Sequence, residues 1–399
     1  MDSDRYTLIN IEQSPSGFLI PRSRLYHLAP IGAGTPYAES LTSYILRLAD
    51  AHCVTSQTLM SKEVIPLLRK GYLKTPRRFL MDDSRTFNGV TQYAKSVVKV
   101  LETLTMRKSL QYHTMSKWAG VVDPAGKGLL KKERTWCPHC YEEWAANGNT
   151  IYDPLIWSIR GVSRCDKHMA LLLSQCPKCR RRQPFLLSRA GVGHCYHCDR
   201  WLGVNLKEVE QKQIADWFLK KMMWMYLAVG EMIAAAPTLD NDPSSLDLTE
   251  ALKRYAGLMA EGNLSELGRR IKMTPHTIRQ WVRGRYRPRF DSLLDLCYRL
   301  NVTPVKLLYG TLEDCASLNL RTSSPQIKRK VRKSKEPAIK KEVVQALLEK
   351  ILAWKRPSSI PKIAKKLGCK DWTLRYHFPG LCREIAEKRK LRKIALRKG

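Results

Sequence analysis

Between residues 136 and 198 the sequence reads WCPHC at 136–140, SRCDKHMALLLSQCPKC at 163–179 and HCYHC at 194–198. These segments contain four pairs of cysteine or histidine in which two residues separate the partners. Such spacing lets both side chains of a tight turn reach one tetrahedral zinc ion, with sulfur at about 2.3 Å from the metal. The candidate ligands are Cys137, Cys140, Cys165, His168, Cys176, Cys179, Cys195 and Cys198. Eight ligands complete two structural zinc sites.

The simplest partition of these ligands follows their order in the chain. The first four would hold one ion and the last four the other, and the fifteen residues between Cys179 and Cys195 fall in the range typical of zinc ribbons. A cross-braced partition would use the same ligands, and the neighbouring His139, His194 and His197 are possible substitutes. A catalytic zinc would leave a coordination position open and need a general base nearby, so thiolate-rich sets of four favour a structural role.

The net charge favours a nucleic-acid partner, and the cysteine content favours metal binding. The 399 residues carry 70 Lys and Arg against 36 Asp and Glu, a formal charge of +34, which is most easily tolerated beside a polyanion such as nucleic acid. No apolar run is long enough to predict a membrane span, and the opening MDSDRYTLINIEQ does not resemble a signal peptide. We therefore expect a cytoplasmic, nucleoid-associated protein without a membrane partner, whose cysteines bind metal rather than form disulfides.

The region before the cysteines has a helical pattern. Pro36 follows Thr35 at the first position of an expected helix, and Leu41, Tyr44, Ile45 and Leu48 then fall on one apolar stripe. Further helical patterns run to about Trp118, and another covers 209–236. The sequence thus predicts a mainly α fold in which the cysteine region adds short β-hairpins.

Residues 263–310 are similar to a repressor-type helix-turn-helix. Leu264, Leu267 and Ile271 would line the first helix, Gly268 would allow close packing, and Lys272 occupies the turn where glycine is most comfortable. Thr274 would cap the second helix and Pro275 would open it, with Ile278 and Trp281 turned inward. The outward residues predicted to bind DNA are His276, Thr277, Arg279, Gln280, Arg283, Arg285 and Arg287. Gln280 suits adenine, Arg279 suits guanine, and the last three arginines suit phosphates.

A second helix-turn-helix candidate is SSIPKIAKKLGCKDWTLRYHFPGLC, at 358–382. Ile363, Ala364, Leu367, Leu374 and Phe378 would pack inside, Gly368 would form the turn, and Pro379 would end the second helix. Its predicted DNA-facing residues are Lys370, Trp372, Thr373, Arg375 and Tyr376. The basic run 328–341, where eight of fourteen residues are Lys or Arg, and the tail 383–398 would add phosphate contacts that do not depend on sequence.

Three motifs together resemble the TniQ/TnsD family of transposition target selectors. PYAESLTSYILRLA at 36–49 resembles the family's opening motif, with Pro36, Glu39, Ser40, Leu41, Arg47 and Leu48 at the matching places. The cysteine segments look like the family's paired zinc ribbons, and HFPGLCREI at 377–385 is similar to the C-terminal pattern of TnsD-type members. The repressor-like module is a departure, because not every member carries it.

This resemblance, with the composition, gives six expected segments. They are a helical TniQ-like domain over 1–125, a paired zinc-ribbon region over 126–205, a helical connector and linker over 206–250, a helix-turn-helix domain over 251–315, a basic linker over 316–341, and a second helix-turn-helix with a basic tail over 342–399.

The resemblance also implies partners and a role. Family members mark a site on double-stranded DNA and recruit an AAA+ ATPase regulator of the TnsC type, which summons the transposase. Some read an attachment sequence directly, and others are adaptors docked on a CRISPR RNA-guided Cascade complex. Two helix-turn-helix candidates favour direct reading.

Two rivals come from other classes. A zinc-containing transcriptional repressor would also use these helices, but it would usually dimerise on a palindrome. A zinc nuclease would need a motif such as H-E-x-x-H or an acidic cluster for two metals, and the sequence has neither. We therefore expect a protein that is not an enzyme.

Overall fold

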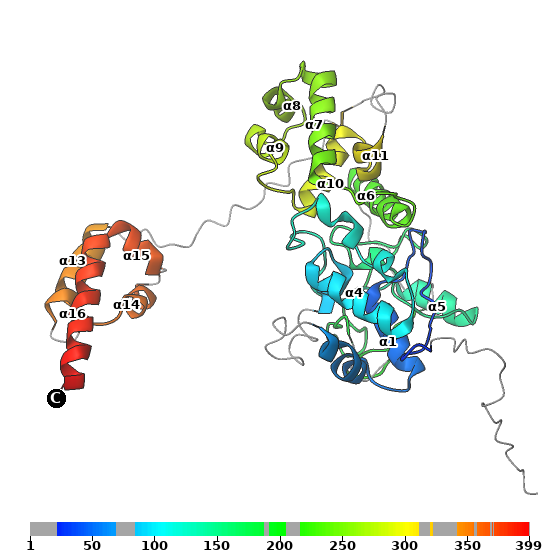
Figure 1. Ribbon diagram of the computed structural model, residues 1–399, viewed down its shortest axis with the longest axis horizontal. Helices are drawn as coiled ribbons and strands as arrows, with labels where there is room; N and C mark the ends of the chain where they lie inside the picture. The colour runs from blue at the N-terminus through cyan, green and yellow to red at the C-terminus, as the bar shows by residue number, and fades with distance from the viewer. Residues whose placement is uncertain are drawn as a thin grey trace, which may run out of the picture. The chain divides into compact units, whose positions relative to one another are not determined.

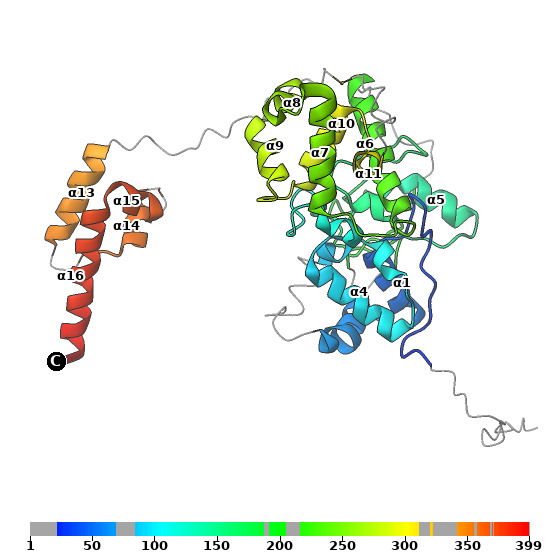
Figure 2. The ribbon, with the colours of Figure 1, turned by 45° about the horizontal axis from the view of Figure 1, so that its top comes forward.

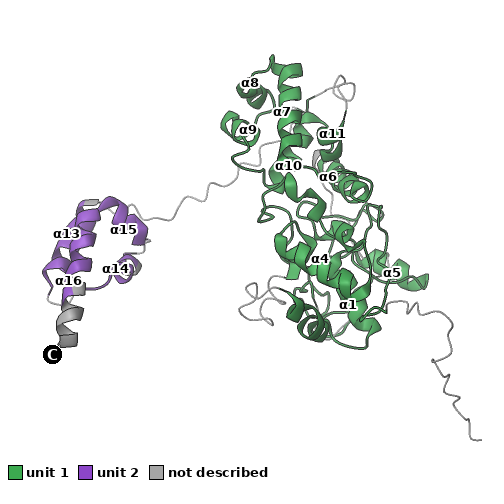
Figure 3. Cartoon of the chain, viewed as in Figure 1, with its two compact units in different colours: residues 1–323 green, residues 324–399 purple. Residues whose placement is uncertain are grey.

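The computed structural model describes residues 22–68, 84–186, 191–204, 216–310, 320–321, 341–354, 357–367, 369 and 371–398. The chain forms two compact units, Met1–Ser323 and Ser324–Gly399 (Figure 3). The described residues are mainly helical, as the sequence predicts. Their β-structure consists of isolated bridges such as Gln175 with Arg182 and His194 with Trp201, so the expected hairpins are present only as single bridges.

The first unit contains most of the helices. Their bounds are α1 (Leu41–Ala51), α2 (Ser56–Leu59), η2 (Met60–Val64), η3 (Ile65–Leu67), η4 (Ser84–Asn88), α4 (Gln92–Thr105), η5 (Leu110–His113), η6 (Ser116–Gly120), α5 (Pro138–Ala146), η7 (Leu155–Ser158), α6 (Asp216–Ala235), α7 (Ser245–Ala260), α8 (Leu264–Arg270), α9 (Pro275–Val282), α10 (Phe290–Leu300) and α11 (Pro304–Tyr309). In both Figure 1 and Figure 2, α8 and α9 lie at the opposite end of this unit from α1.

Helix α1 begins at Leu41, whereas the sequence predicts a helix that starts at Pro36. The prediction for Pro36 is wrong because the chain turns here, with the N–H of Thr35 donating to the carbonyl oxygen of Gly32 and the N–H of Ala38 to that of Thr35. The side chain of Ser40 caps α1 by accepting a hydrogen bond from the backbone N–H of Ser43, which satisfies one of the free donors at a helix start. The predicted stripe of Leu41, Tyr44, Ile45 and Leu48 is completely buried. It packs with residues of α2, η2 and α4 in one hydrophobic core.

A second and larger core continues through the rest of the first unit. It includes residues of η6, the cysteine region, α6 and the bundle α7–α11, so it crosses the boundaries expected at 125, 205 and 250. Trp118 of η6 is buried within it, and its indole Nε1 donates to the carbonyl oxygen of Met232 in α6 at 3.2 Å. The segments expected on either side of these boundaries therefore share one core, and the boundaries themselves remain a prediction.

The second unit is a small helical bundle with a core of its own. It contains α13 (Lys341–Ala353), α14 (Ile360–Lys366), α15 (Asp371–His377) and α16 (Pro379–Lys398). Ile363, Ala364 and Leu374 are buried in its core, and Phe378 packs against it. Helix α15 ends at His377 and α16 begins at Pro379, where the sequence predicts a break. The predicted turn residue Gly368, the site residue Lys370 and residues 328–340 of the basic run lie outside the described residues.

Candidate metal centres and nucleic-acid interface

The eight predicted ligands gather into two groups of four. One group is Cys137, Cys140, Cys165 and His168, the other is Cys176, Cys179, Cys195 and Cys198, and within each group all ligand atoms lie within 4.8 Å of one another. The structure therefore has the sequential partition rather than the cross-braced one. Each group could hold one metal ion.

The distances within each group fit zinc. A tetrahedral ion with sulfur at about 2.3 Å requires sulfur atoms about 3.8 Å apart, and a ligand nitrogen about 3.6 Å from each sulfur. In the second group, Cys176 Sγ lies 3.7 Å from Cys198 Sγ, and Cys179 Sγ lies 3.7 Å from Cys195 Sγ. In the first group, His168 Nδ1 lies 3.3 to 3.7 Å from the three sulfur atoms. Thiolate and imidazole are the donors that zinc prefers.

Three of the four ligand pairs have the same backbone turn. Cys165, Cys176 and Cys195 each donate their N–H to a carbonyl oxygen five residues later. The residue after the second ligand of each pair has a left-handed backbone, with φ of 52° at Met169, 59° at Arg180 and 55° at Asp199. This turn points both ligand side chains to the same side, which explains the spacing of two residues.

The fourth pair is built on a helix. Cys137 is the N-cap residue of α5, Pro138 is its first residue, and Cys140 follows within the first turn. A helix N-terminus carries partial positive charge, which favours thiolates at these positions. Hydrogen bonds from the neighbouring thiols of Cys140 and Cys165 lower the pKa of Cys137 below its usual value, which also favours a thiolate in the first group.

Sequence reasoning did not identify the residues that support the ligands. Glu143 Oε2 lies 3.5 Å from His168 Nε2, so this carboxylate can orient the imidazole whose Nδ1 faces the metal position. Gln183 Nε2 and the backbone N–H of His197 both donate to Cys195 Sγ at 3.4 Å. Glu143 could have been found from the sequence, because it lies one helical turn after Cys140 in α5 and so on the same side of the helix.

The three alternative histidines are outside both groups. His194 Nδ1 is 3.1 Å from the carbonyl oxygen of Asp199, and His197 Nε2 is 3.3 Å from that of Arg182. The His139 ring lies beside the His168 ring, with the centroids 5.5 Å apart.

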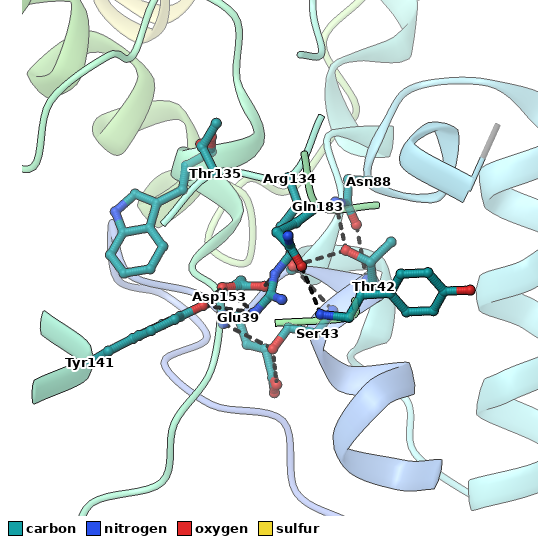
Figure 4. A network of polar contacts seen from close by, with 12 residues as sticks. Glu39, Thr42, Ser43, Asn88, Arg134, Thr135, Tyr141, Asp153 and Gln183 are labelled. Carbon is teal, nitrogen blue, oxygen red and sulfur yellow. Dashed lines mark hydrogen bonds and ion pairs between the residues drawn. The ribbon is translucent and has the colours of Figure 1, made fainter. Parts of the chain in front are cut away.

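A buried polar network joins α1 to the cysteine region (Figure 4). Glu39 is completely buried, pairs with Arg47 at 2.6 Å, and accepts a hydrogen bond from Ser43 Oγ at 2.9 Å. Ser43 Oγ in turn accepts from the backbone N–H of Asp153, whose carboxylate pairs with Arg134 Nε at 2.6 Å. Burial raises the pKa of Glu39 to about 7, although the charge of Arg47 opposes this.

This network explains the spacing of the opening motif. Glu39, two residues before α1, forms an ion pair with Arg47 inside the helix, eight residues later. Leu41 and Leu48 lie on the buried side of α1 and fill the core. Arg134, 1% exposed, also donates to the hydroxyl of Tyr141 in α5 at 2.8 Å. The same polar network therefore contacts both α1 and the segment that leads into the first metal group.

Helices α8 and α9 form a two-helix unit with an exposed, basic outer face. A Cβ on Gly268 would lie 3.0 Å from Pro275 Cα, so glycine is needed for the close approach of the two helices. Lys272 in the turn has φ of 54°, the left-handed conformation that the sequence interpretation anticipated. Ile278 and Trp281 are buried. Thr274 is the N-cap of α9, but its side chain makes no capping bond, and its carbonyl oxygen accepts from Thr277 and Ile278 instead.

The predicted DNA-facing residues of this unit divide into two sets. His276, Arg279, Arg283, Arg285 and Arg287 are exposed. Thr277 and Gln280 are half-buried, and Gln280 Oε1 is covered and without a hydrogen-bond partner. Because α9 turns Gln280 toward the packed side of the helix, Arg279 is better placed than Gln280 to reach a ligand.

Helix α15 in the second unit also has an exposed face. Trp372 is 57% exposed and Tyr376 is 76% exposed, and these residues are one helical turn apart with Arg375 exposed beside them. Thr373 is half-buried and its Oγ1 is covered. The two aromatic rings and the guanidinium therefore make up an exposed face on α15.

Comparison with protein families matches residues 30–172 to the TniQ family model. The chain carries a TniQ-family domain. The match begins just before the opening motif and ends between the two metal groups, so it includes Cys137, Cys140, Cys165 and His168 but not the second group. None of the curated proteins that were compared matches this chain.

The TniQ domain indicates a transposition-related DNA-binding protein, with partners from the transposition machinery. The TniQ match contains the ion pairs of the buried polar network, Glu39 with Arg47 and Arg134 with Asp153. In the part of the chain that the structure describes, no helix combines the length and the apolar character that a membrane crossing requires.

Proposed function

We propose that this TniQ protein selects DNA target sites for a transposon by reading sequence through helix-turn-helix modules. The observation that carries the proposal is the exposed face of α9, where His276, Arg279 and Arg283 project from a helix pair packed around Gly268. A helix of this kind fits the major groove, and Arg279 has the guanidinium geometry that pairs with guanine. The second unit adds α15, whose Trp372, Arg375 and Tyr376 would contact a neighbouring stretch of DNA.

The two metal groups are proposed to hold structural zinc. All eight ligand atoms are used in two closed sets, which leaves no coordination position for a substrate. Zinc would fix the loops between α5 and α6. In this proposal the chain itself catalyses nothing, and it recruits an AAA+ ATPase regulator to the marked site.

An RNA-guided adaptor is the second candidate role. In that role a CRISPR Cascade complex would supply the sequence recognition, and this chain would bind DNA through its charge alone. The +34 charge supports DNA binding in either role, but the exposed α9 face favours direct reading. A transcriptional repressor remains the third reading, and it would need no ATPase partner.

In vitro selection of the full chain on a random duplex library separates these roles. Direct reading predicts a recovered consensus sequence, which Arg279→Ala loses at one base pair and Arg269→Ala retains, because Arg269 on α8 is paired with Glu266. Recovery of no consensus, with binding that weakens steeply in salt, would support the adaptor role. A consensus that is bound without any recruitment of the ATPase regulator would support the repressor.

A further inference from the structure

The segment between α9 and α10 forms a basic ridge fixed to the TniQ domain. Here Arg283, Arg285, Arg287 and Arg289 alternate with Gly284, Tyr286 and Pro288. The backbone N–H of Arg285 donates to the carbonyl oxygen of Gln280 at 3.2 Å, which ties the start of the segment to α9. Tyr286 at its centre is 69% exposed.

The far end of the segment is tied to residues 119–127 of the TniQ domain. Asp123 donates its backbone N–H to the carbonyl oxygen of Pro288 at 2.8 Å, and Phe290 donates to that of Lys127 at 3.1 Å. Arg287 Nη1 donates to the carbonyl oxygen of Ala119 at 3.1 Å. These bonds fix the backbone of the segment at both ends, and the last one also fixes the side chain of Arg287.

The positive charge continues from the segment onto the TniQ domain. Arg289 pairs with Asp291 at 2.8 Å. Arg160 is exposed, its backbone N–H donates to the carbonyl oxygen of Leu129 at 2.7 Å, two residues from Lys127, and its charge helps to lower the pKa of Asp291. Burial alone would raise the pKa of Asp291, but the two guanidiniums outweigh that effect. Lys127 is exposed and lies 3.5 Å from Asp123.

We define the basic ridge as Arg283, Arg285, Tyr286, Arg287, Arg289, Lys127 and Arg160. Six of these residues are cationic, and two of them pair with a carboxylate, Lys127 with Asp123 and Arg289 with Asp291, so the cations outnumber these carboxylates by four. The excess is costly in isolation, and a polyanion would relieve it.

We propose that the basic ridge binds the sugar-phosphate backbone of duplex DNA that flanks the sequence read by α9, so that the TniQ domain itself contacts the target. This inference rests on the proposed function and extends it to Lys127, Arg160, Tyr286 and Arg289. The ridge begins at Arg283, at the end of α9, so a duplex seated on α9 would pass along it. Guanidinium, ammonium and phenol groups are the usual donors to phosphate oxygens. Since the backbone of the ridge is already bonded at both ends, binding loses little backbone entropy, and the cost of ordering falls on the exposed side chains.

The test compares two duplexes, one trimmed to the sequence selected by the full chain and one carrying flanking DNA on both sides. Lys127→Ala with Arg160→Ala should weaken binding of the longer duplex by about tenfold and lower the slope of log affinity against log salt by about 2. Tyr286→Phe, which removes only the hydroxyl, should weaken the longer duplex by a smaller factor. Binding of the trimmed duplex and the preferred sequence should not change.

A matched control is Lys95→Ala with Lys99→Ala. These two lysines are exposed on α4, near the other end of the unit, and their loss should leave both duplexes bound as before. Zinc content and melting temperature confirm that each variant is folded. If the ridge variant binds both duplexes as the unaltered chain does while Arg279→Ala still loses its base preference, the ridge proposal is wrong and the proposed function stands. If the unaltered chain selects no duplex, both proposals are wrong.

Discussion

Gly120 and Pro243 approach so closely that a Cβ on residue 120 would overlap the carbonyl oxygen of Pro243. Gly120 ends η6 of the TniQ domain, and Pro243 directly precedes Ser244, the cap of α7. Lys117 in η6 reinforces the contact by pairing with Asp242 at 2.8 Å. This junction sets the position of the α7–α11 bundle on the TniQ domain.

Gly120→Ala should therefore destabilise the first unit by about 1 to 3 kcal/mol, because the backbone of residue 243 must move to accept the methyl group. Thermal or denaturant unfolding of the full chain measures the change. Gly257→Ala is the control, since a Cβ there meets no atom within 4 Å. Residue 257 is inside α7, so alanine should stabilise the protein by up to about 1 kcal/mol. Equal effects from both substitutions would show that the junction is not tightly packed.

The sequence predicted the local features of the structure well. The apolar stripe of α1, the left-handed turn at Lys272 and the break at Pro379 all depend on residues close together in the chain. The pairing of the metal ligands follows from the same principle, because each pair lies in a single turn. The partition of the pairs into two groups joins distant segments, and the sequence left the cross-braced alternative open.

The features that the sequence did not predict depend on packing between distant segments. Gln280 is half-buried, with its Oε1 covered, because of how α9 packs against its neighbours, and a helical pattern alone does not fix the burial of a residue at the edge of the packed face. The support of His168 by Glu143 and the junction of Gly120 with Pro243 join residues 25 and 123 positions apart, and no periodicity reports such contacts. Glu39 and Arg47 were predicted only in part, since the family motif singled them out but only the structure shows that they form an ion pair.

Glu39→Ala should be strongly destabilising, by about 3 to 5 kcal/mol. It leaves Arg47 partly buried without its carboxylate and removes the acceptor of the Ser43 hydroxyl. The matched control is Glu63→Ala, which breaks an exposed pair with Arg24 and should cost no more than about 1 kcal/mol. Denaturant unfolding compares the two variants, and a Glu39→Ala protein as stable as Glu63→Ala would contradict the role given to the network.

Removing one ligand of the second metal group should remove one metal ion. Cys176→Ser is expected to lower bound zinc from about two ions per chain to about one, and to lower the melting temperature, because the ion fixes two turns that have little core of their own. Cys53→Ser is the control, since Cys53 is exposed and outside both groups. Metal analysis by mass spectrometry gives the stoichiometry. Two ions retained in Cys176→Ser would contradict the assignment of this residue as a ligand.

Acid should destabilise the first unit through His113. Burial lowers the pKa of this imidazole to about 4, and its Nδ1 donates to the carbonyl oxygen of Glu39 at 2.7 Å. Because the folded pKa is below the unfolded value of 6.5, the contribution is complete above about pH 6.5 and is lost as the pH falls toward 4. The full effect is roughly 3 kcal/mol. NMR titration should find His113 neutral at pH 6, and His113→Gln should reduce the loss of stability between pH 6.5 and pH 5. A charged imidazole at pH 6 would be the contrary result.

The exposed aromatic residues of α15 should contribute to DNA binding. Trp372→Ala and Tyr376→Ala are each expected to weaken binding of the selected duplex by about fivefold, close to 1 kcal/mol, since each removes a large side chain from the face proposed to meet DNA. Both residues are exposed, whereas the neighbouring Leu374 fills the core, so the bundle should keep its stability. Leu347→Ala is the control, because it removes an exposed apolar side chain from α13 in the same unit. Fluorescence anisotropy measures the affinity. If both aromatic variants bind as tightly as Leu347→Ala does, the prediction that the face of α15 contacts the selected duplex is wrong.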